Sequence, residues 1–316
     1  ANGSTTGTLA SQVAEVKTIS ATISGTTVAG SPTVTFVAGD ASTLSKISGD
    51  LQSGIVETWL SNPFVVEVRD AFGNLVAGKA VTFATHDSPP AAQGQILSVE
   101  STTTNAVGQA TSVLKLGDLT GEYEVAATIE WVDEPVVYFT AEAKPSGATN
   151  ILLYSGNNQS GTVGTALAEP FVVKVTDANG NAVGGVDVTF SIYSHPGVST
   201  GSLSPTSTVQ TDTDGLAEST LTLGTTVGLT VVSAVSGTLV GSPVNFTANA
   251  VAGSADTIAI ISGNNQNAVI NSQLSPFIVQ VTDQFLNPKS GVQVTFTITS
   301  AVNGAFLTAP IGTTSP

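Results

Sequence analysis

The chain has 316 residues, of which 8 are lysine or arginine and 23 are aspartate or glutamate, so its formal net charge is −15. With an isoelectric point near 4.1 and only 10% charged residues, the chain has no basic surface for a phosphate backbone, which excludes nucleic-acid binding. It contains no cysteine and 2 histidines, which excludes disulfides, thiolate metal sites, cysteine nucleophiles and most histidine-based metal centres.

The chain also lacks methionine, so we expect a mature form or a piece of a longer protein. Mean hydropathy is +0.29, yet no window of about 18 residues is free of glycine, proline and charge, and we expect no membrane insertion. We find no glycine-rich phosphate loop and no paired-carboxylate cleft, and we expect neither enzymatic activity nor a cofactor.

Three sequence anchors recur along the chain and divide it into repeats. The first anchor is SGD or SGN at 48–50, 155–157 and 262–264, with a spacing of 107 residues. The second opens with Pro-Phe and reads PFVVEVRDAFGN, PFVVKVTDANGN and PFIVQVTDQFLN, and the third is Val-Thr-Phe at 81–83, 188–190 and 294–296. We therefore expect complete domains at 41–145 and 146–252, with partial domains at 1–40 and 253–316.

The second half of the repeat recurs as well. NAVGQATSVLKLG at 105–117 matches TDGLAESTLTLG at 213–224, and EPVVYFTAEA at 134–143 matches SPVNFTANAV at 242–251. A third copy of that last segment, SPTVTFVAGD, lies at 31–40, and we align its Phe36 with Phe246.

Within each repeat the apolar residues alternate with polar ones. Phe171, Val173 and Val175 share one face of a segment whose other face carries Val172, Lys174 and Thr176, a period of two that indicates a strand with one face on a core. Short strands rich in Val, Ile, Thr and Phe are separated every 8 to 12 residues by turn residues, a pattern typical of β-sandwiches. The sequence thus predicts an all-β chain of tandem immunoglobulin-like sandwiches.

These segments resemble the group 1 bacterial immunoglobulin-like domain, the stalk module of invasin- and intimin-type surface adhesins. The resemblance lies in PFVVKVTDANGNAVGGVDVTFSI, then TDTDGLAESTLTLGTTVG, then SPVNFTANA, and it extends over the chain. It implies an extracellular or cell-surface location and a role as spacer or adhesin stalk. It identifies no receptor, and such a partner stays unknown.

The partial domains at the two ends carry complementary halves of one repeat. Residues 1–40 hold its last strands and residues 253–316 its first strands, so each half alone leaves strand edges and an apolar face open. We expect the two halves of neighbouring chains to combine head to tail into a homopolymeric filament. The residues expected at this contact are Ile19, Ile23, Val34 and Phe36 on one side and Phe277, Val279, Val281, Phe296 and Ile298 on the other.

Two other arrangements would join the same halves. Closure within one chain would require linkers of about five residues, which reach at most roughly 17 Å, to bend around two intact sandwiches, so we set it aside. A long covalent array of such domains, of which these residues are one period, would place the halves next to each other without any chain break. In that alternative the chain is a segment of an adhesin stalk that presents a binding tip found elsewhere.

One loop has the residue types of a calcium site. Asp177, Asn179 and Asn181 have the spacing that opens a calcium-binding loop, in which alternate oxygens converge on the cation. The equivalent loops carry Phe72 and Phe285 at the middle position, however, and a hairpin turn in which the aspartate accepts backbone N–H groups explains the motif equally simply. We favour the turn and predict no bound metal.

Overall fold

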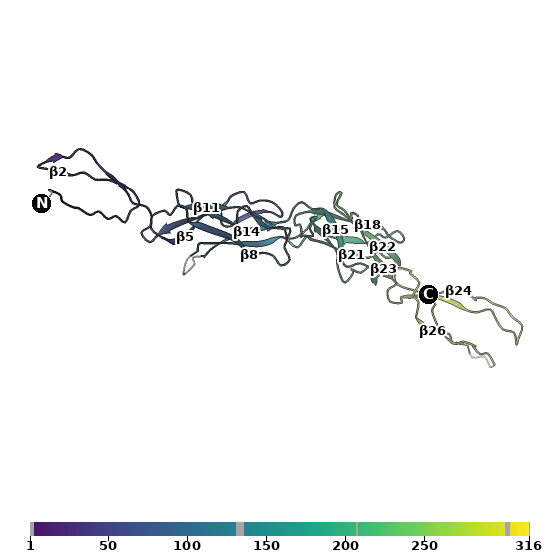
Figure 1. Ribbon diagram of the computed structural model, residues 1–316. Helices are drawn as coiled ribbons and strands as arrows, with labels where there is room; N and C mark the ends of the chain where they lie inside the picture. Colours follow the sequence, from purple (N-terminus) through teal and green to yellow (C-terminus); the bar gives the residue numbers. More distant parts are fainter. Residues whose placement is uncertain (1–2, 131–135, 207, 301–303, 316) are drawn as a thin grey trace. The chain divides into compact units, whose positions relative to one another are not determined.

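The computed structural model describes residues 3–130, 136–206, 208–300 and 304–315, and all of the regular structure in them is β-strand (Figure 1). Residues 134 and 135 of the repeated segment 134–143, and both chain ends, lie outside this range. The predicted all-β class is confirmed. In the described range there is no helix that could cross a membrane. The chain divides into two compact units, Ala1–Ser146 and Gly147–Pro316.

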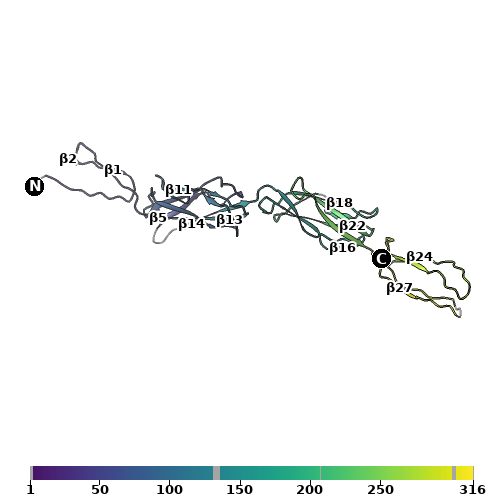
Figure 2. The same ribbon diagram turned by 45° about the vertical axis from the view of Figure 1, so that its right-hand side comes forward.

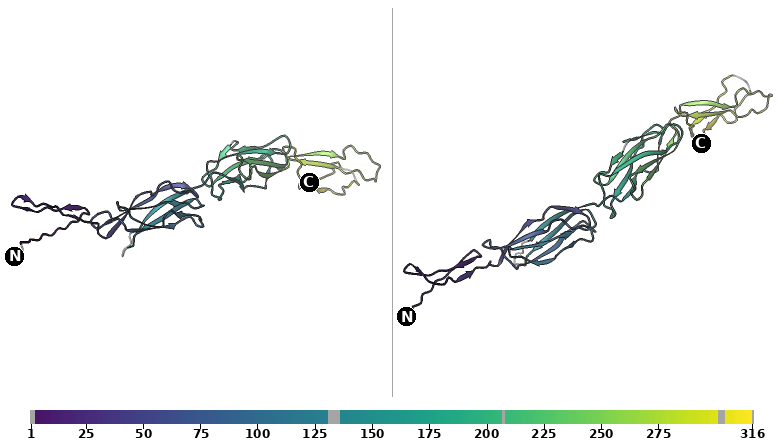
Figure 3. Two further views of the ribbon diagram at one scale, coloured as in Figure 1. Left: turned by 45° about the horizontal axis from the view of Figure 1, so that its top comes forward. Right: turned by 90° about the horizontal axis from the view of Figure 1, so that it is seen from above.

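The second unit contains a complete sandwich of two sheets, drawn in teal and green in Figure 3. The first sheet has the order β15-β17-β21-β19 and the second the order β16-β23-β22-β18-β20. The strands of the first sheet are β15 (Asn150–Ser155), β17 (Phe171–Thr176), β21 (Leu216–Thr222) and β19 (Ser202–Ser204). Those of the second are β16 (Gln159–Thr162), β23 (Val244–Val251), β22 (Gly228–Val235), β18 (Asp187–Ser194) and β20 (Thr208–Gln210).

The first unit contains a second complete sandwich, in which equivalent strands follow one another in the same order along the chain. Its sheets have the orders β11-β7-β5 and β10-β8-β13-β14-β6, with a further pair β12-β9. The strands of the first sheet and of the pair are β5 (Ala41–Ser48), β7 (Phe64–Asp70), β11 (Gln109–Ser112), β9 (Ile96–Leu97) and β12 (Leu114–Lys115). The strands of the other sheet are β6 (Gln52–Ile55), β8 (Ala80–Asp87), β10 (Ser101–Thr103), β13 (Gly121–Thr128) and β14 (Val136–Lys144).

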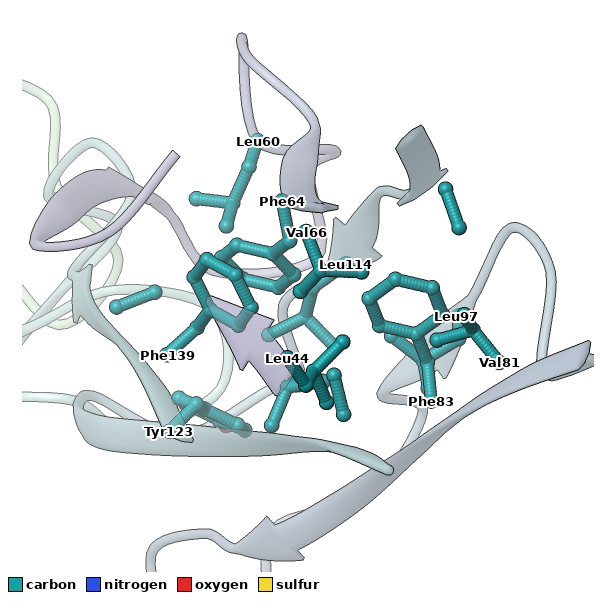
Figure 4. Close-up of a cluster of buried hydrophobic side chains, with 14 of the residues drawn as sticks. Leu44, Leu60, Phe64, Val66, Val81, Phe83, Leu97, Leu114, Tyr123 and Phe139 are labelled. Atoms are coloured by element: carbon teal, nitrogen blue, oxygen red, sulfur yellow. The ribbon is translucent and has the colours of Figure 1, made fainter. Parts of the chain in front are cut away.

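Inward-facing residues of the two sheets form the core of each sandwich, as the alternating pattern predicts. In the first unit Phe64 and Phe139, both fully buried, stack with ring centroids 4.7 Å apart (Figure 4). In the second unit Phe171 and Phe246 repeat this stack at 4.9 Å. Such stacked pairs contribute roughly 0.5–1.5 kcal/mol beyond the burial of their area.

The SGD and SGN anchors form a tight local structure that closes each sandwich at one end. A Cβ atom on Gly156 would lie only 1.9 Å from the carbonyl oxygen of Pro170, and its φ of +86° is one that glycine adopts without strain. The Gln159 side chain then spans the loop, because its Nε2 donates to the carbonyls of Gly156 and Glu169 at 2.6 and 2.8 Å. Gln52 and Gln266 make the equivalent bonds in the other two copies.

The N-terminal segment forms an extended hairpin (Figure 2). β1 (Val16–Thr18) pairs with β4 (Thr33–Thr35), and the shorter β2 (Thr22–Ile23) pairs with β3 (Thr26–Thr27) at the tip. In the range that the structure describes, no strand pairs with the outer edge of either β1 or β4.

The C-terminal segment forms two separate strand pairs. β24 (Thr257–Ser262) pairs with β25 (Ile278–Thr282), and β26 (Gln293–Thr295) pairs with β27 (Ile311–Thr313). The register of β24 on β25 matches that of β15 on β17, including the irregularity one residue before the anchor serine. The local sequence therefore forms the same first strand pair here as in the complete sandwiches, whereas β26 has only 3 residues against 8 in β18.

Candidate assembly surfaces

The C-terminal segment has counterparts of β15, β17, β18 and β20, whereas its counterparts of β16 and β19 form no strand. Its counterpart of β18 is β26, and residues 266–269 stand where β16 stands in the complete sandwich. In that sandwich β22 and β23 occupy the middle of the sheet, between β18 and β16. No described strand of the second unit fills the equivalent position beside β26. The segment thus lacks two central strands of one sheet and one strand of the other.

An apolar cavity of about 350 Å³ lies where those strands are missing. Phe277, which corresponds to the fully buried Phe171, is 47% exposed, and Ile298 is 45% exposed. The lining residues are Ile260, Ser262, Asn264, Phe277, Ile278, Val279, Phe296, Thr297, Ile298 and Leu307. We call this surface the acceptor cleft.

The predicted acceptor residues do not all lie in that cleft. Phe277, Val279, Phe296 and Ile298 line it, whereas Val281 is already 95% buried and lines a separate, shallower hollow. Val281 therefore lies outside the acceptor cleft, and its part in assembly stays a prediction. Lys289 donates its backbone N–H to the Val281 carbonyl at 2.8 Å, as Val183 does to Val175, so the turn at this end of the strand forms without the missing strands.

One face of the N-terminal hairpin carries its larger apolar side chains together with the ion pair of Glu15 and Lys17, and the other face is rich in hydroxyl groups. Directly opposed residues of an antiparallel pair share a face. The pairs Lys17–Val34 and Glu15–Phe36 therefore lie on one face, and alternation along the strand adds Ile19 and Ile23 to it. The opposite face carries Thr18, Thr22, Thr27, Thr33 and Thr35. We call the first face the donor face.

The donor face is exposed in the single chain. Ile19, Ile23 and Val34 are 39, 71 and 37% exposed, and Phe36 is half-buried. Their counterparts in the complete sandwiches are inside the core, so the hairpin is an amphipathic sheet without its opposing layer. The four predicted donor residues therefore share one face, as the sequence indicated.

Asparagine side chains fix how each segment meets the next sandwich along the chain. Asn287 donates from Nδ2 to the Thr225 carbonyl at 2.8 Å and accepts from the Val227 N–H at 3.2 Å. Asn74 makes the same pair of bonds, at 2.9 Å each, to the Gln12 carbonyl and the Ala14 N–H. Gln12 and Ala14 are thus the counterparts of Thr225 and Val227.

A second hydrogen bond at each joint holds a residue that follows the last strand, which in the hairpin is β4. Gly39 donates its N–H to Asp70 Oδ2 at 2.9 Å, and Gly253 donates to Asp283 Oδ2 at the same distance. Gly39 is therefore the counterpart of Gly253, and the gapless match of Val-Ala-Gly at 37–39 and 251–253 agrees with this.

These contacts correct the alignment of the last strand. Counting back from Gly39, Phe36 falls at the position of Ala250, four residues beyond Phe246, and Pro32 falls at the position of Phe246. The pairing of Val16 with Thr35 has the same register as that of Leu229 with Asn249. Aligning Phe36 with Phe246 is therefore wrong, although a shift of four residues keeps every side chain on the same face.

The aspartate of each joint is held as a carboxylate by its own turn. Asp70 accepts the N–H groups of Phe72 and Asn74 at Oδ1, and the Asn74 amide and the Gly39 N–H at Oδ2. The hydrogen bond from the Asn74 side chain is the main cause that lowers the pKa of Asp70 to about 2. Burial opposes ionisation of Asp283, but hydrogen bonds led by that of Asn287 outweigh it and also lower its pKa.

The calcium candidates form the same turn. Asp177 Oδ1 accepts the backbone N–H groups of Asn179 and Asn181 at 3.0 and 2.9 Å, and Oδ2 accepts the Asn181 amide at 3.0 Å. Asp177 and Asn181 are buried, whereas Asn179 is exposed. In the described range no three His, Cys, Asp or Glu side chains gather in a way that could hold a metal ion. The arrangement is that of the hairpin turn, and the absence of bound calcium stays a prediction to be measured.

A serine segment with the spacing Gly-x-Ser-x-Gly occurs at 197–201. It joins β18 to β19, whereas a nucleophile elbow joins a strand to a helix. Ser199 Oγ accepts the Thr225 N–H at 3.3 Å. The segment is therefore a loop contact between strands.

Sequence reasoning missed Asn74, Asn287 and the phenylalanines between them and the aspartates. The signal was present, because Asp-x-Phe-x-Asn occurs in two of the three loops. The sequence motif alone predicts a turn and does not show that the asparagine side chain also forms hydrogen bonds with the preceding segment.

No family model matches the chain. The chain is similar to solved structures of bacterial surface proteins. These include FdeC, an Escherichia coli adhesin, at 20% identity over 74% of each chain with a TM-score of 0.44. They also include invasin, a bacterial integrin-binding protein, at 17% identity over 82% of this chain and 52% of that one with a TM-score of 0.37. Domains 4 and 5 of the S-layer protein SbsC match at 19% identity over 68% of this chain and all of theirs, with a TM-score of 0.33.

Proposed function

We propose that the chain is the structural subunit of an extracellular or cell-surface filament, in which residues 1–40 of one copy complete the sandwich begun by residues 253–316 of the next. The donor hairpin enters between β26 and residues 266–269, and residues 4–10 add the missing strand of the other sheet beside β25. The observation that carries the proposal is that β1 and β4 of the N-terminal hairpin are the counterparts of the two central strands missing beside β26, while residues 4–10 have the sequence position of β21.

The pairings inside the two complete sandwiches suggest one register for this contact. Ala234 pairs with Phe190 in one and Ala127 with Phe83 in the other, and the same pairing in the proposed domain would put Ala21 opposite Phe296. One further step along the strands places Ile19 opposite Ile298. Burying about half a dozen such apolar side chains, at roughly 1.5–3 kcal/mol each when fully buried, supplies the main stabilisation.

Side-chain sizes support this register. In the first sandwich Gly54 pairs with Ala143, and a Cβ on Gly54 would lie 2.9 Å from the Leu116 side chain above it. The acceptor has Ala268 in place of that glycine, and the donor has Phe36 in place of that alanine. The donor has only small residues, Ala10 and Ser11, just before Gln12, where the sandwiches have leucine. In the proposed shared core, the larger side chains of Phe36 and Ala268 are thus offset by the smaller side chain of Ala10.

Removing the donor segment tests the proposal. The purified 316-residue chain should form filaments in electron microscopy, whereas the chain without residues 1–40 should remain monomeric at the same concentration. Filaments from the shortened chain would overturn strand donation. If the full chain also stays monomeric, the covalent alternative, a segment of a long adhesin stalk, holds instead.

A matched pair of substitutions tests the donor face. Ile19→Glu places a carboxylate where Val125 and Val232 are fully buried, and should abolish assembly. Thr18→Glu adds the same charge one residue earlier, where the first sandwich has the half-buried Glu124, and should preserve assembly. Equal effects of the two would contradict the facing of the hairpin.

A further inference from the structure

The joint between the second sandwich and the C-terminal segment contains an aromatic contact. Two ring atoms of Phe285 lie 3.4 Å from where a Cβ of Gly164 would stand. Gly164 belongs to a turn in which Thr165 donates its N–H and its hydroxyl to the Thr162 carbonyl at 3.1 and 2.8 Å. The ring therefore packs on the turn of the preceding sandwich, beside the Asn287 hydrogen bonds.

Phe72 is the counterpart of Phe285 and lacks this partner in the single chain. It is 64% exposed, against 38% for Phe285. The asparagine half of its joint is nonetheless complete, because Asn74 binds Gln12 and Ala14 as Asn287 binds Thr225 and Val227.

The turn that would receive Phe72 lies at the other end of the chain. Residues 269–272 are the counterpart of 162–165, and Ser272 donates its N–H and hydroxyl to the Val269 carbonyl at 3.2 and 2.6 Å, as Thr165 does to Thr162. Asn271 has a φ of +67°, close to the +72° of Gly164. Ile270 is 93% exposed, whereas its counterparts Val56 and Val163 are 97% buried.

We propose that Phe72 of one copy packs on the turn 269–272 of a second copy, the one whose acceptor cleft holds the donor hairpin of the first. This packing forms a second contact between subunits, in addition to the donated strands. This inference rests on the proposed function. Once residues 12 and 14 are part of the completed sandwich, the Asn74 bonds hold Phe72 over that turn in the way the Asn287 bonds hold Phe285 over Gly164. The occupant is a second copy of this chain, because only the completed domain brings the turn to Phe72.

Cross-linking tests the contact directly, since the chain has no cysteine of its own. Filaments of Phe72→Cys/Asn271→Cys treated with a short bismaleimide should give a ladder of covalent oligomers on a denaturing gel. Phe72→Cys alone should give nothing larger than a dimer. Filaments of the double variant that yield no ladder would overturn the contact while leaving strand donation intact. Absence of filaments from the unmodified chain would overturn both.

Assembly measurements give an independent test. Phe72→Ala should raise the critical concentration for filament formation about tenfold, which is the loss expected for one aromatic packing contact. Phe285→Ala removes the same ring from the joint inside the chain and should leave the critical concentration unchanged. An unchanged value for Phe72→Ala, or equal increases for both variants, would contradict the proposal.

Discussion

The sandwich of residues 147–252 and the segment of residues 253–316 have nearly the same sequence at their start but differ in burial. Phe171 is fully buried and Phe277 is 47% exposed, although both follow a proline and begin the same strand. In the segment, Gln266 repeats the side-chain hydrogen bonds of Gln159, and β24 pairs with β25 in the register of β15 with β17. The comparison teaches that local sequence forms the strands and anchors, whereas the core requires the last three strands of the repeat.

The largest expected effect comes from the same substitution at the two equivalent phenylalanines. Phe171→Ala should destabilise its sandwich by about 3–5 kcal/mol, because it empties a packed core. Phe277→Ala should leave the unfolding of the unassembled chain unchanged and should instead raise the critical concentration for assembly. Denaturant unfolding below the assembly concentration measures the first, and sedimentation measures the second. A large loss of monomer stability in Phe277→Ala would mean that the segment has a core of its own.

The register of the shared core can be tested by a paired exchange of volume. Phe36→Ala should weaken assembly by about 3–5 kcal/mol, and Ala268→Leu added to it should restore part of that loss, because the two side chains oppose each other in the proposed register. The double variant should therefore assemble better than Phe36→Ala alone in sedimentation assays. If Phe36 instead stacked on Phe277, Ala268→Leu would give no rescue.

A smaller effect concerns acid. The pKa of Asp70 in the folded chain is about 2, below its ordinary value of about 3.9, so its carboxylate stabilises the fold above about pH 4. That contribution is lost as the pH falls from about 4 toward 2. Thermal melts between pH 5 and 2 should therefore fall more steeply for the native chain than for Asp70→Asn. Parallel curves would mean that the turn does not depend on the ionised carboxyl.

The smallest effect concerns calcium. Because the Asp177 oxygens are occupied by hydrogen bonds from their own turn, millimolar calcium should leave the melting temperature unchanged. A rise in the native chain that is absent in Asp177→Ala would establish a calcium site at the second loop.

Most of the fold could be predicted from the sequence, because the alternating strands and the spacing of the anchors are local properties. The donor residues Ile19, Ile23, Val34 and Phe36 share a face for the same reason. The alignment of Phe36 failed because it relied on the shared Ser-Pro motif and the Phe near it. The hydrogen bonds at the joints show that Gly39 is the counterpart of Gly253, and counting back from this glycine gives the correct alignment. The strand pattern does not show that Val281 lies outside the acceptor cleft, because the pattern gives the face of a side chain but not the extent of the cleft along the strand.

In the complete sandwich, the strands that the acceptor lacks lie in the middle of a sheet, between β18 and β16, and in the proposed assembly they would be inserted between β26 and residues 266–269. A strand added to an edge can leave by breaking one ladder, but a hairpin inserted between two strands must break ladders on both sides while its apolar side chains return to water. On the proposed assembly, subunits would therefore leave much more slowly than they join. The length distribution of such filaments would then depend on the conditions during growth rather than on the protein concentration at which they are later stored.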